Sequence, residues 1–351
     1  MRFPEFEGEW KKKKFDQICT IATGNKNTQD KEGDGDYPFF VRSETIERIN
    51  SYSFDGEAIL TAGDGVGVGK IFHYVNGKVG VHQRVYILSD FKCFGKYAYY
   101  YFTSRFYNRV KRMSAKNSVD SVRRDMIAQM SISLPGFDEQ SKIARFLSLL
   151  DERIATQNKI IEDLKLLKNT IRHTLFTQLE KSDTETKLIK DVLDYEQPLK
   201  YIVGNTEYQN NSVLTPVLTA NKAFILGYTS EKNNIYGKGE CIIFDDFTMD
   251  LKYVDFPFKI KSSAIKILTP KSRIILKYIY EYLCFLNLVS NDHKRHYISE
   301  VESISIYVPL IGMQNTFSNL LSALDKKIQG ESYYLNLLLS QKYYLLRHIF
   351  V

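Results

Sequence analysis

The chain has 351 residues, of which 44% are apolar and 25% are charged, a balance that excludes disordered, collagen-like and disulfide-scaffold proteins. Lys and Arg number 48 against 41 Asp and Glu, and the resulting net charge of +7 is weak evidence for a polyanionic partner. No apolar run is long enough for a membrane-spanning helix. The charged N-terminus lacks the apolar core of a signal peptide, so we expect a cytoplasmic protein without a membrane partner. The length favours two domains.

The first predicted block covers residues 10–136. Short apolar or alternating runs predict strands at PFFVRSE, EAILTAG, KIFHYVNGK and VGVHQRVYIL, and Asn76-Gly77 predicts a hairpin. The run Gly63–Lys70 (GDGVGVGK) departs from a phosphate-binding loop because Asp64 and Ile71 replace the required glycine and hydroxyl residue. It is predicted to be a glycine-rich turn, either a structural one or one that brings Lys70 near a ligand. The aromatic stretch KYAYYYFTSRFYNRVKRM predicts a helix.

A strand, SISLP, and one long helix from about 138 to 178 follow. The apolar positions of this helix alternate by four and three residues, which indicates a heptad seam and a helix–helix pairing. A helix of this length exceeds the diameter of a small domain, so packing only on its own domain is the less favoured alternative. The polar residues Gln157 and Lys168 interrupt the seam. The predicted seam comprises Ile143, Leu147, Leu150, Ile154, Ile161, Leu164, Ile171 and Leu175.

After a polar linker at 181–187, the second block, 186–309, repeats the order of the first. Its strand signals are TPVLTANKAFILGYT, GECIIFDD and SSAIKILT, its aromatic helix is RIILKYIYEYLCFLNLV, and its last strand is SISIYVP. A shift of 174 residues aligns 127–176 with 301–350 without a gap and with 12 identities in 50 positions, so the chain is a duplication. Glu331 and Lys342 interrupt the second seam. Its residues are Phe317, Leu321, Leu324, Ile328, Leu335, Leu338, Leu345 and Ile349.

No pattern typical of a catalytic or metal centre is found. The four cysteines lie far apart without a C-x-x-C pair, so we expect reduced, buried and inert thiols. The histidines form no H-E-x-x-H motif, and neither G-x-S-x-G nor an N-P-P-Y-like tetrad occurs. Asp245-Asp246 could bind a metal, but the pair is better interpreted as shaping a loop or as accepting hydrogen bonds from cytosine amino groups.

Two basic zones give the stronger signal. Residues 101–130 hold seven basic and two acidic side chains, and 252–277 hold seven basic and one acidic. The basic part of residues 101–130 precedes the first repeat strand, and the basic stretch SNDHKRHYIS takes the equivalent place before the second repeat strand. A solvated helix face explains one such stretch but explains two at equivalent positions poorly, so nucleic acid is favoured. The candidate DNA-binding residues are Lys26, Arg42, Lys70, His82, Gln83, Arg84, Arg112, Lys116, Asn117, Ser118, Arg123, Arg124, Asn221, Lys222, Asp245, Asp246, Lys261, Ser262, Ser263, Lys294 and Arg295.

These features together resemble the DNA-specificity (S) subunit of Type I restriction-modification systems. RFPEFEGEW (2–10) is similar to the usual start of that family, and residues 134–176 resemble its central conserved helix region. TPVLTANKAFILGYTSEKNNIYGKGECIIFDDFT and KIKSSAIKIL resemble one type of its target-recognition domain. The second copy departs from the pattern P-x-x-x-x-Q-x-K-I, because Met313 and Thr316 stand in place of Glu and Lys.

The resemblance implies an α+β fold in which two pseudo-twofold-related, mixed α/β target-recognition domains (1–136 and 182–310) are separated by two long antiparallel coiled-coil spacer helices (137–181 and 311–351). Each domain would read one half of a bipartite double-stranded DNA target. The helices would set the gap and dock two methyltransferase subunits, and restriction/translocation subunits would join through the complex. The chain itself would have no active site and no cofactor or metal. S-adenosylmethionine, ATP and Mg are expected in the partner subunits.

Two alternatives remain open at the level of sequence. One is an enzyme with an unrecognised motif, which saturable S-adenosylmethionine binding by the chain alone would reveal. The other is a coiled-coil scaffold or general DNA-binding protein without sequence preference, for which the salt dependence of binding would be that of any basic protein.

Overall fold

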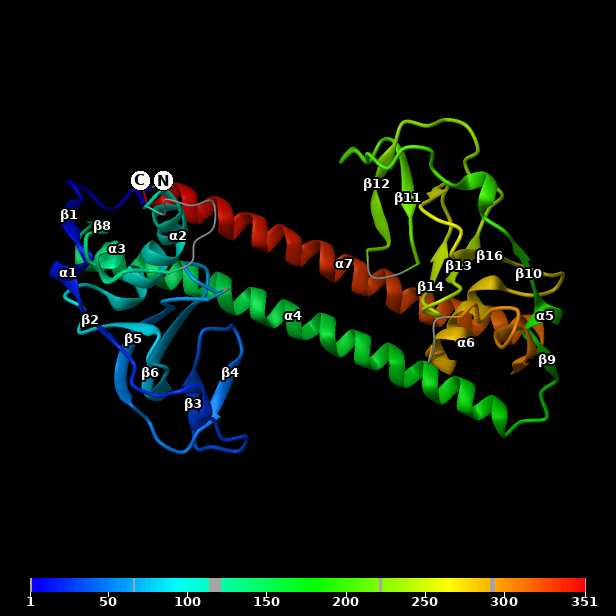
Figure 1. Cartoon of the computed structure of the whole chain (residues 1–351), viewed down its shortest axis with the longest axis horizontal. Coiled ribbons are helices and arrows are strands. Elements are labelled where there is room, and N and C mark those ends of the chain that lie inside the picture. Colours follow the sequence, from blue (N-terminus) through cyan, green and yellow to red (C-terminus); the bar gives the residue numbers. More distant parts are fainter. Residues whose placement is uncertain (1, 66, 114–120, 221–222, 291–293, 351) are drawn as a thin grey trace. The chain divides into compact units, whose positions relative to one another are not determined.

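The computed structural model of the chain divides into two compact units (Figure 1). Unit 1 comprises residues 1–158 together with 333–351, and unit 2 comprises residues 159–332. The residues that the structure describes are 2–65, 67–113, 121–220, 223–290 and 294–350.

Unit 1 is built around a six-stranded sheet with the strand order β2-β7-β5-β6-β3-β4. Neighbouring strands are antiparallel, except that β3 and β6 are parallel. A separate antiparallel pair joins β1 and β8. The strands are β1 (Lys11–Lys14), β2 (Thr20–Thr23), β3 (Tyr37–Phe40), β4 (Ile46–Ile49), β5 (Phe54–Ala62), β6 (Phe72–Val81), β7 (Val85–Ser89) and β8 (Ser131–Leu134).

The main helix of unit 1 is α2 (Gly95–Met113), the predicted aromatic helix. Its buried face packs in one hydrophobic core with the sheet, with the first half of α4 (Phe137–Glu180) and with the last turns of α7 (Ile311–Ile349). The described residues of unit 1 also form the short helices α1 (Phe15–Ile18), η1 (Thr28–Asp30) and α3 (Arg124–Ala128).

The glycine-rich turn predicted at residues 63–70 is confirmed, whereas the hairpin predicted at Asn76-Gly77 is wrong. Strands β5 and β6 pair from Phe54 with Val79 to Thr61 with Phe72, and the glycine-rich turn closes that hairpin. Asn76-Gly77 therefore lies inside β6, where Gly77 faces Gly56. Both glycines have positive φ, 129° and 135°, a backbone conformation that other residues rarely adopt, and the strand register continues unbroken past them.

Unit 2 contains a four-stranded sheet of order β10-β16-β13-β14, a three-stranded sheet of order β12-β11-β15, and the pair β17-β9. In the three-stranded sheet, β11 and β15 are parallel. They correspond to the parallel pair β3 and β6 of unit 1. The strands are β9 (Thr186–Leu188), β10 (Leu193–Glu196), β11 (Thr215–Leu218), β12 (Ile225–Thr229), β13 (Cys241–Asp245), β14 (Leu251–Val254), β15 (Lys259–Ile260), β16 (Ile265–Pro270) and β17 (Ser305–Tyr307).

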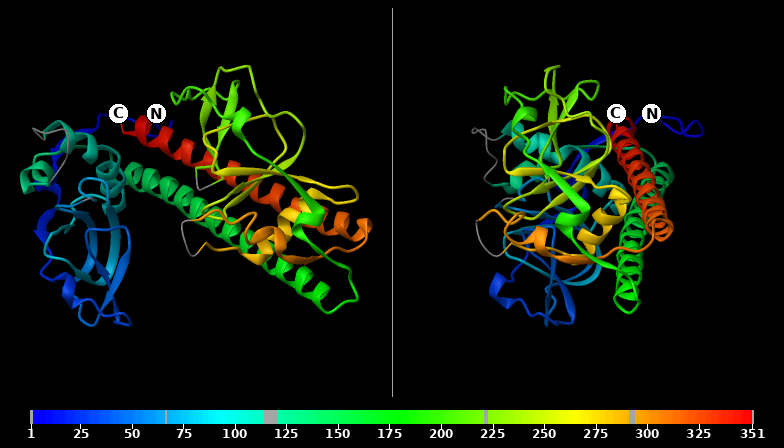
Figure 2. Two further views of the ribbon diagram at one scale, coloured as in Figure 1. Left: turned by 45° about the vertical axis from the view of Figure 1, so that its right-hand side comes forward. Right: turned by 90° about the vertical axis from the view of Figure 1, so that its right-hand side faces the viewer.

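The predicted second aromatic helix is α6 (Leu276–Leu286), which packs with the second half of α4 and the first half of α7 (Figure 2). The short helices are α5 (Ile189–Val192), η2 (Leu199–Tyr201) and η3 (Val301–Ser303). The predicted linker at 181–187 is shorter than expected, because its last two residues belong to β9 and pair with β17. The mixed α/β architecture with two long helices is thus confirmed.

The duplication extends to individual contacts. Residues Lys14 and Ser131 pair at the start of β8, and Leu188 and Ser305, each 174 residues later, pair in the same way. The ring of Phe350 contacts Tyr97 and Tyr101 at 5.4 and 5.3 Å between centroids. Its equivalent in unit 2, Phe176, contacts two tyrosines of α6 at 5.6 and 4.8 Å. The two units are therefore structural repeats of each other.

The shared glutamine of the two repeats ties the start of a long helix to the aromatic helix. Gln140 donates to the carbonyl of Pro135 at 2.8 Å and accepts from the backbone N–H of Phe94 at 2.9 Å. Gln314 makes the same two bonds at the same distances, to the carbonyl of Pro309 and from the N–H of Ile275. The spacing P-x-x-x-x-Q follows from this bridge.

Unit 1 shows what the Glu and Lys of the helix-start pattern do, which Met313 and Thr316 replace in the second copy. Arg2 donates two bonds to the buried carboxylate of Glu139, at 2.9 and 2.8 Å, and Glu5 forms an ion pair with Lys142. These contacts fasten the N-terminal segment 2–10 to α4. The equivalent residues of α7, Met313 and Thr316, carry no charge and cannot form these ion pairs, and β9 is preceded by the turn and coil residues 181–185 that follow α4.

Candidate nucleic-acid interface

Four connections meet at one end of the unit 1 sheet, and their described residues form what we call loop cluster 1: residues 24–27, 41–45, 63–65 with 67–71, and 82–84. The backbone fixes them together: the N–H of His82 donates to the carbonyl of Phe40 at 3.0 Å, and the N–H of Gly63 donates to the carbonyl of Arg84 at 2.8 Å. Lys26 forms a bridge with His82. Three predicted residues far apart in sequence, Lys26, Arg42 and Arg84, thereby become neighbours.

Two arginines of loop cluster 1 share one carboxylate. The Nη1 atom of Arg42 donates to Oδ1 of Asp64 at 2.9 Å, and the Nη1 atom of Arg84 donates to Oδ2 at 2.9 Å. The arginine side chains are 44% and 63% exposed, so their remaining donors face solvent. Asp64 was no candidate in the sequence, because its role depends on contacts with residues about 20 positions away on either side.

His82, which bonds the backbone of Phe40 and of Arg84, is buried. One ring nitrogen of His82 bonds the hydroxyl of Thr28 at 3.2 Å, and the other accepts from the N–H of Arg84 at 3.0 Å. Burial lowers the pKa of His82, and the positive charge of Arg42 lowers it further. His82 therefore supports the loop from within as a neutral side chain. Its neighbour Gln83 is exposed and bonds Asn27 at 2.6 Å.

The other candidates of unit 1 lie around the cluster. The N–H of Val122 donates to the carbonyl of Gly63 at 2.7 Å, which brings the exposed Arg123 and Arg124 next to loop cluster 1. The Nζ atom of Lys70 lies 5.3 Å from the ring centre of Tyr107. Arg112 is exposed at the end of α2. The candidates Lys116, Asn117 and Ser118 lie outside the described residues.

Unit 2 repeats the backbone frame of loop cluster 1. The N–H of Lys261 donates to the carbonyl of Leu218 at 3.1 Å, and the N–H of Asp246 donates to the carbonyl of Ala264 at 2.8 Å. The N–H of His296 donates to the carbonyl of Asp246 at 2.9 Å. These three bonds correspond to those of His82, Gly63 and Val122. We call the equivalent segments, 218–220, 245–250, 261–264 and 294–296, loop cluster 2.

The two aspartates of loop cluster 2 are buried and bonded within the protein. Oδ1 of Asp245 accepts from the N–H groups of Phe247 and Thr248, both at 3.0 Å, and so shapes the turn after β13. Asp246 is 1% exposed, accepts from the N–H of Tyr297 at 2.9 Å and lies 3.5 Å from the buried ammonium of Lys266. Of the alternatives raised by the sequence, this geometry favours loop shaping.

The remaining candidates of unit 2 lie on its surface. Lys261 and Ser262 are exposed, and Ser263 is half-buried. Lys294 forms an ion pair with Glu300 at 2.8 Å, and the guanidinium of Arg295 lies 5.7 Å from the ring centre of Phe247. Asn221 and Lys222 lie outside the described residues.

Within each unit, the segments of α4 and α7 pack antiparallel. In unit 1, Ile143 and Ile349 line one small cavity of about 140 Å³, while Asp151 bonds Lys342 nearer the middle of both helices. In unit 2, Phe176 contacts Phe317 and Lys168 bonds Asp325. All sixteen predicted seam residues are buried or half-buried.

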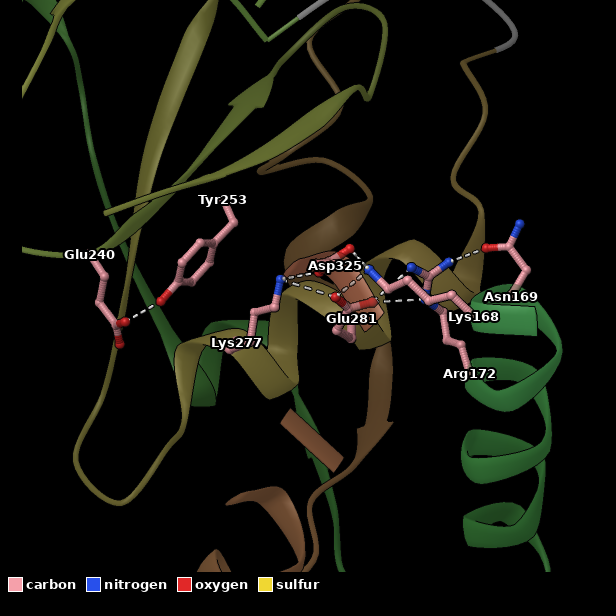
Figure 3. Close-up of polar contacts among 8 residues, drawn as sticks. All are labelled: Lys168, Asn169, Arg172, Glu240, Tyr253, Lys277, Glu281 and Asp325. Atoms are coloured by element: carbon pink, nitrogen blue, oxygen red, sulfur yellow. Dashed lines mark hydrogen bonds and ion pairs between the residues drawn. The ribbon is translucent and has the colours of Figure 1, made fainter. Parts of the chain in front are cut away.

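The interrupting Lys168 belongs to a charge network in unit 2 (Figure 3). Its Nζ atom lies 3.0 Å from Oε1 of Glu281 and 2.6 Å from Oδ1 of Asp325. Arg172 donates to Oε2 of Glu281 through two nitrogens, at 2.9 and 2.7 Å, and Lys277 bonds both carboxylates. Glu281 is fully buried, so these three cations offset the cost of its burial.

The described residues contain no cluster of His, Cys, Asp and Glu side chains that could hold a metal ion. In the same part of the chain no helix combines the length and apolar character needed to cross a membrane. Burial raises the pKa of Cys19, Cys93 and Cys241 to about 12, which keeps these thiols protonated.

Residues 7–166 match the family described as "Type I restriction modification DNA specificity domain". Two curated relatives come from Escherichia coli: the Type I restriction enzyme EcoR124I/EcoR124II specificity subunit, 43% identical over 137 residues, and the EcoDI specificity subunit, 25% identical over 169 residues. The matches cover 37% and 48% of this chain. They cover 34% and 37% of the relatives, so the chain matches little more than a third of their length.

Solved structures share the fold over the whole chain. The S subunit of a Type-I restriction-modification system from M. genitalium has a TM-score of 0.71 at 18% identity and is covered to 99%, with 100% of this chain aligned. A structure described as showing complex assembly and conformational transition of the type I R-M system has a TM-score of 0.56 at 12% identity, covering 99% of this chain and 98% of that one.

These likenesses define the class of protein. The predicted resemblance to specificity subunits of Type I restriction-modification systems is confirmed. Residues 7–166 match the family of Type I restriction modification DNA specificity domains, and the chain as a whole shares the fold of the S subunit from M. genitalium.

Proposed function

We propose that this chain is the non-catalytic DNA-recognition subunit of a Type I restriction-modification complex. Residues 1–136 and 182–310 act as target-recognition domains, and each reads one half of a bipartite DNA target. The spacer helices, 137–181 and 311–351, set the gap between the halves and dock two methyltransferase subunits. Those partners supply S-adenosylmethionine, while restriction/translocation subunits supply ATP- and Mg-dependent cleavage.

One observation carries the proposal: both units use the same three backbone bonds to hold loops with different side chains. In loop cluster 1 the exposed residues include Arg42, Gln83 and Arg84, and in loop cluster 2 they include Lys261 and Ser262. Side chains of these types donate to base edges and to phosphates. A common frame with different surface residues is what the reading of two different half-sites requires.

The test is a map of N6-methyladenine across the genome of cells that contain the partner methyltransferase, with and without this chain. Loss of a two-part motif with a fixed gap on deletion supports the proposal and reveals the target. Unchanged methylation with an active methyltransferase contradicts it and favours a scaffold without sequence preference. Saturable binding of S-adenosylmethionine by the purified chain would instead indicate an enzyme.

A further inference from the structure

The shared carboxylate of loop cluster 1 restricts the motion of two side chains that the proposed function places against DNA. An unpaired surface arginine samples many rotamers, and fixing it on binding costs side-chain entropy. Asp64 holds Arg42 and Arg84 at 2.9 Å each, one on either carboxylate oxygen. Each guanidinium uses one of its five N–H donors for this contact. The remaining donors are available in a defined direction.

The glycines of the run 63–70 make room for this arrangement. A Cβ at Gly63 would lie 2.9 Å from the carbonyl oxygen of Arg84, and one at Gly67 would lie 2.6 Å from that of Arg42. A Cβ at Gly65, where φ is +82°, would lie 4.0 Å from Nη1 of Arg42. Gly63 and Gly67 therefore let the turn pack closely against the backbone of Arg84 and Arg42.

Unit 2 lacks all three side chains on the same backbone frame. Counted from the equivalent bonds, Ala220 and Ala264 occupy the positions of Arg42 and Arg84, and Phe247 occupies that of Asp64. The frame thus folds without the arginines and without the carboxylate. The three charged residues are specific to unit 1 and change together, as residues that read one particular half-site would.

The charge of the group favours bases over phosphates. One carboxylate between two guanidiniums leaves a net charge of +1 and places a negative group where it repels a phosphate. The O6 and N7 atoms of guanine are neutral acceptors that match the fork of an arginine in the major groove. We propose that Asp64 is a positioning residue and that, through it, Arg42 and Arg84 specify G·C base pairs in one half of the target. This inference rests on the proposed function.

The experiment maps N6-methyladenine motifs in cells with the partner methyltransferase and one variant of the full chain. The variants are Asp64→Asn, Arg84→Lys, Arg84→Ala and Arg42→Ala. The alanine variants keep the frame, since unit 2 carries alanine at both positions. Asp55→Asn is the matched control: it removes the same charge from an exposed residue at the opposite end of β5, for which the described residues show no ion pair.

We expect a G·C position of one half-site to become degenerate in every test variant, with discrimination there falling by about 5- to 150-fold. The other half-site, the gap and the Asp55→Asn motif stay unchanged. Arg84→Lys is decisive, because lysine keeps the charge needed by a phosphate contact but loses the bidentate fork. If lysine preserves the motif, or if all variants weaken methylation at every site without changing the motif, the inference is overturned. If deletion of the whole chain leaves methylation intact, the proposed function fails instead.

Discussion

The carboxylate of Asp151 lies 2.5 Å from the ammonium of Lys342 in unit 1. The 174-residue repeat converts this pair into Asp325 and Lys168 of unit 2, which lie 2.6 Å apart. The surroundings of the two pairs differ. Lys342 is 31% exposed, whereas Lys168 is 9% exposed and also contacts the buried Glu281. The duplicated ion pair is thus partly exposed to solvent in unit 1 and buried from solvent on its lysine side in unit 2.

This difference predicts unequal effects of the same substitution. Lys342→Met should lower the free energy of unfolding by about 1 kcal/mol or less, as for other solvent-exposed ion pairs. Asp151 also keeps a hydrogen bond from Tyr100 at 2.7 Å. Lys168→Met should cost about 3 kcal/mol, because it removes a cation from two carboxylates in a buried network. Urea unfolding followed by circular dichroism measures both. Equal losses would show that burial does not distinguish the pairs.

Glu281 and Arg172 extend the charge network around Lys168 and Asp325 in unit 2. At the positions of Glu281 and Arg172, unit 1 has Tyr100 and Leu346, so the two sites differ in a coordinated way. Glu281→Tyr alone should cost about 3–5 kcal/mol, since it leaves buried cations without their main partner. Combining it with Arg172→Leu should recover at least about 1 kcal/mol relative to the sum of the single variants.

The double-mutant cycle requires a control without contact to the network. Lys159→Leu is suitable, because Lys159 is 70% exposed on the same helix and its ion pair within the described part of the chain is with Asp163, outside the network. Combined with Glu281→Tyr, it should give additive losses. Additivity of Arg172→Leu as well would contradict a direct coupling across this cluster.

The pH dependence of unit 2 should reflect Glu196. Burial favours its neutral form, but hydrogen bonds from Lys200 and Lys238, each at 2.7 Å, outweigh that effect and lower the pKa of Glu196 to about 2. A depressed folded-state pKa contributes stability above the unfolded value, near 4.5, that is lost as the pH falls toward 2. The midpoint of thermal unfolding should therefore fall over this window, and less steeply in Glu196→Gln. An identical slope in both proteins would contradict the assignment.

The glutamines that bridge each long helix to its aromatic helix should have matching effects. Gln140→Met and Gln314→Met each leave a proline carbonyl and a backbone N–H without a partner, at a cost of about 1–3 kcal/mol. Because the bridges lie in different units, the losses should add. Gln178→Met, an exposed glutamine on α4, is the control and should be neutral. Loss at only one bridge would mean that the repeats are not equivalent here.

The sequence predicted what local patterns encode. Heptad spacing located α4 and α7, aromatic-rich stretches located α2 and α6, and a proline marked the end of each repeat strand. What depends on contacts between distant segments was missed or misplaced. Asn76-Gly77 has hairpin chemistry, yet a competing turn at 63–70 closes the strand pair. His82 is followed by the polar residues Gln83 and Arg84, yet the fold buries it against Thr28.

The same limit applies to the acidic residues. For Asp245 and Asp246 the sequence left loop shaping and acceptance from cytosine amino groups both open, and in the structure backbone N–H groups and Lys266 contact the two carboxylates inside the fold. Asp64 drew attention only as a departure from a phosphate-binding loop, and its two arginine partners became visible only in three dimensions. Composition and spacing identify residue types that can bind DNA. They do not reveal which of them the fold leaves exposed.

The two loop clusters belong to different units, so substitutions in loop cluster 2 should act on one half-site alone. Lys261→Ala and Ser262→Ala alter exposed residues of loop cluster 2 and should change the methylation motif in the half-site that Asp64→Asn leaves intact. A base-reading contact should cost about 1–3 kcal/mol at one base pair, whereas a phosphate contact should weaken all sequences alike. Asp246→Asn, at a buried residue, should instead lower the stability of unit 2 and reduce methylation at every site without changing the motif. A single variant that altered both half-sites would contradict modular recognition, because each cluster is held by bonds within its own unit.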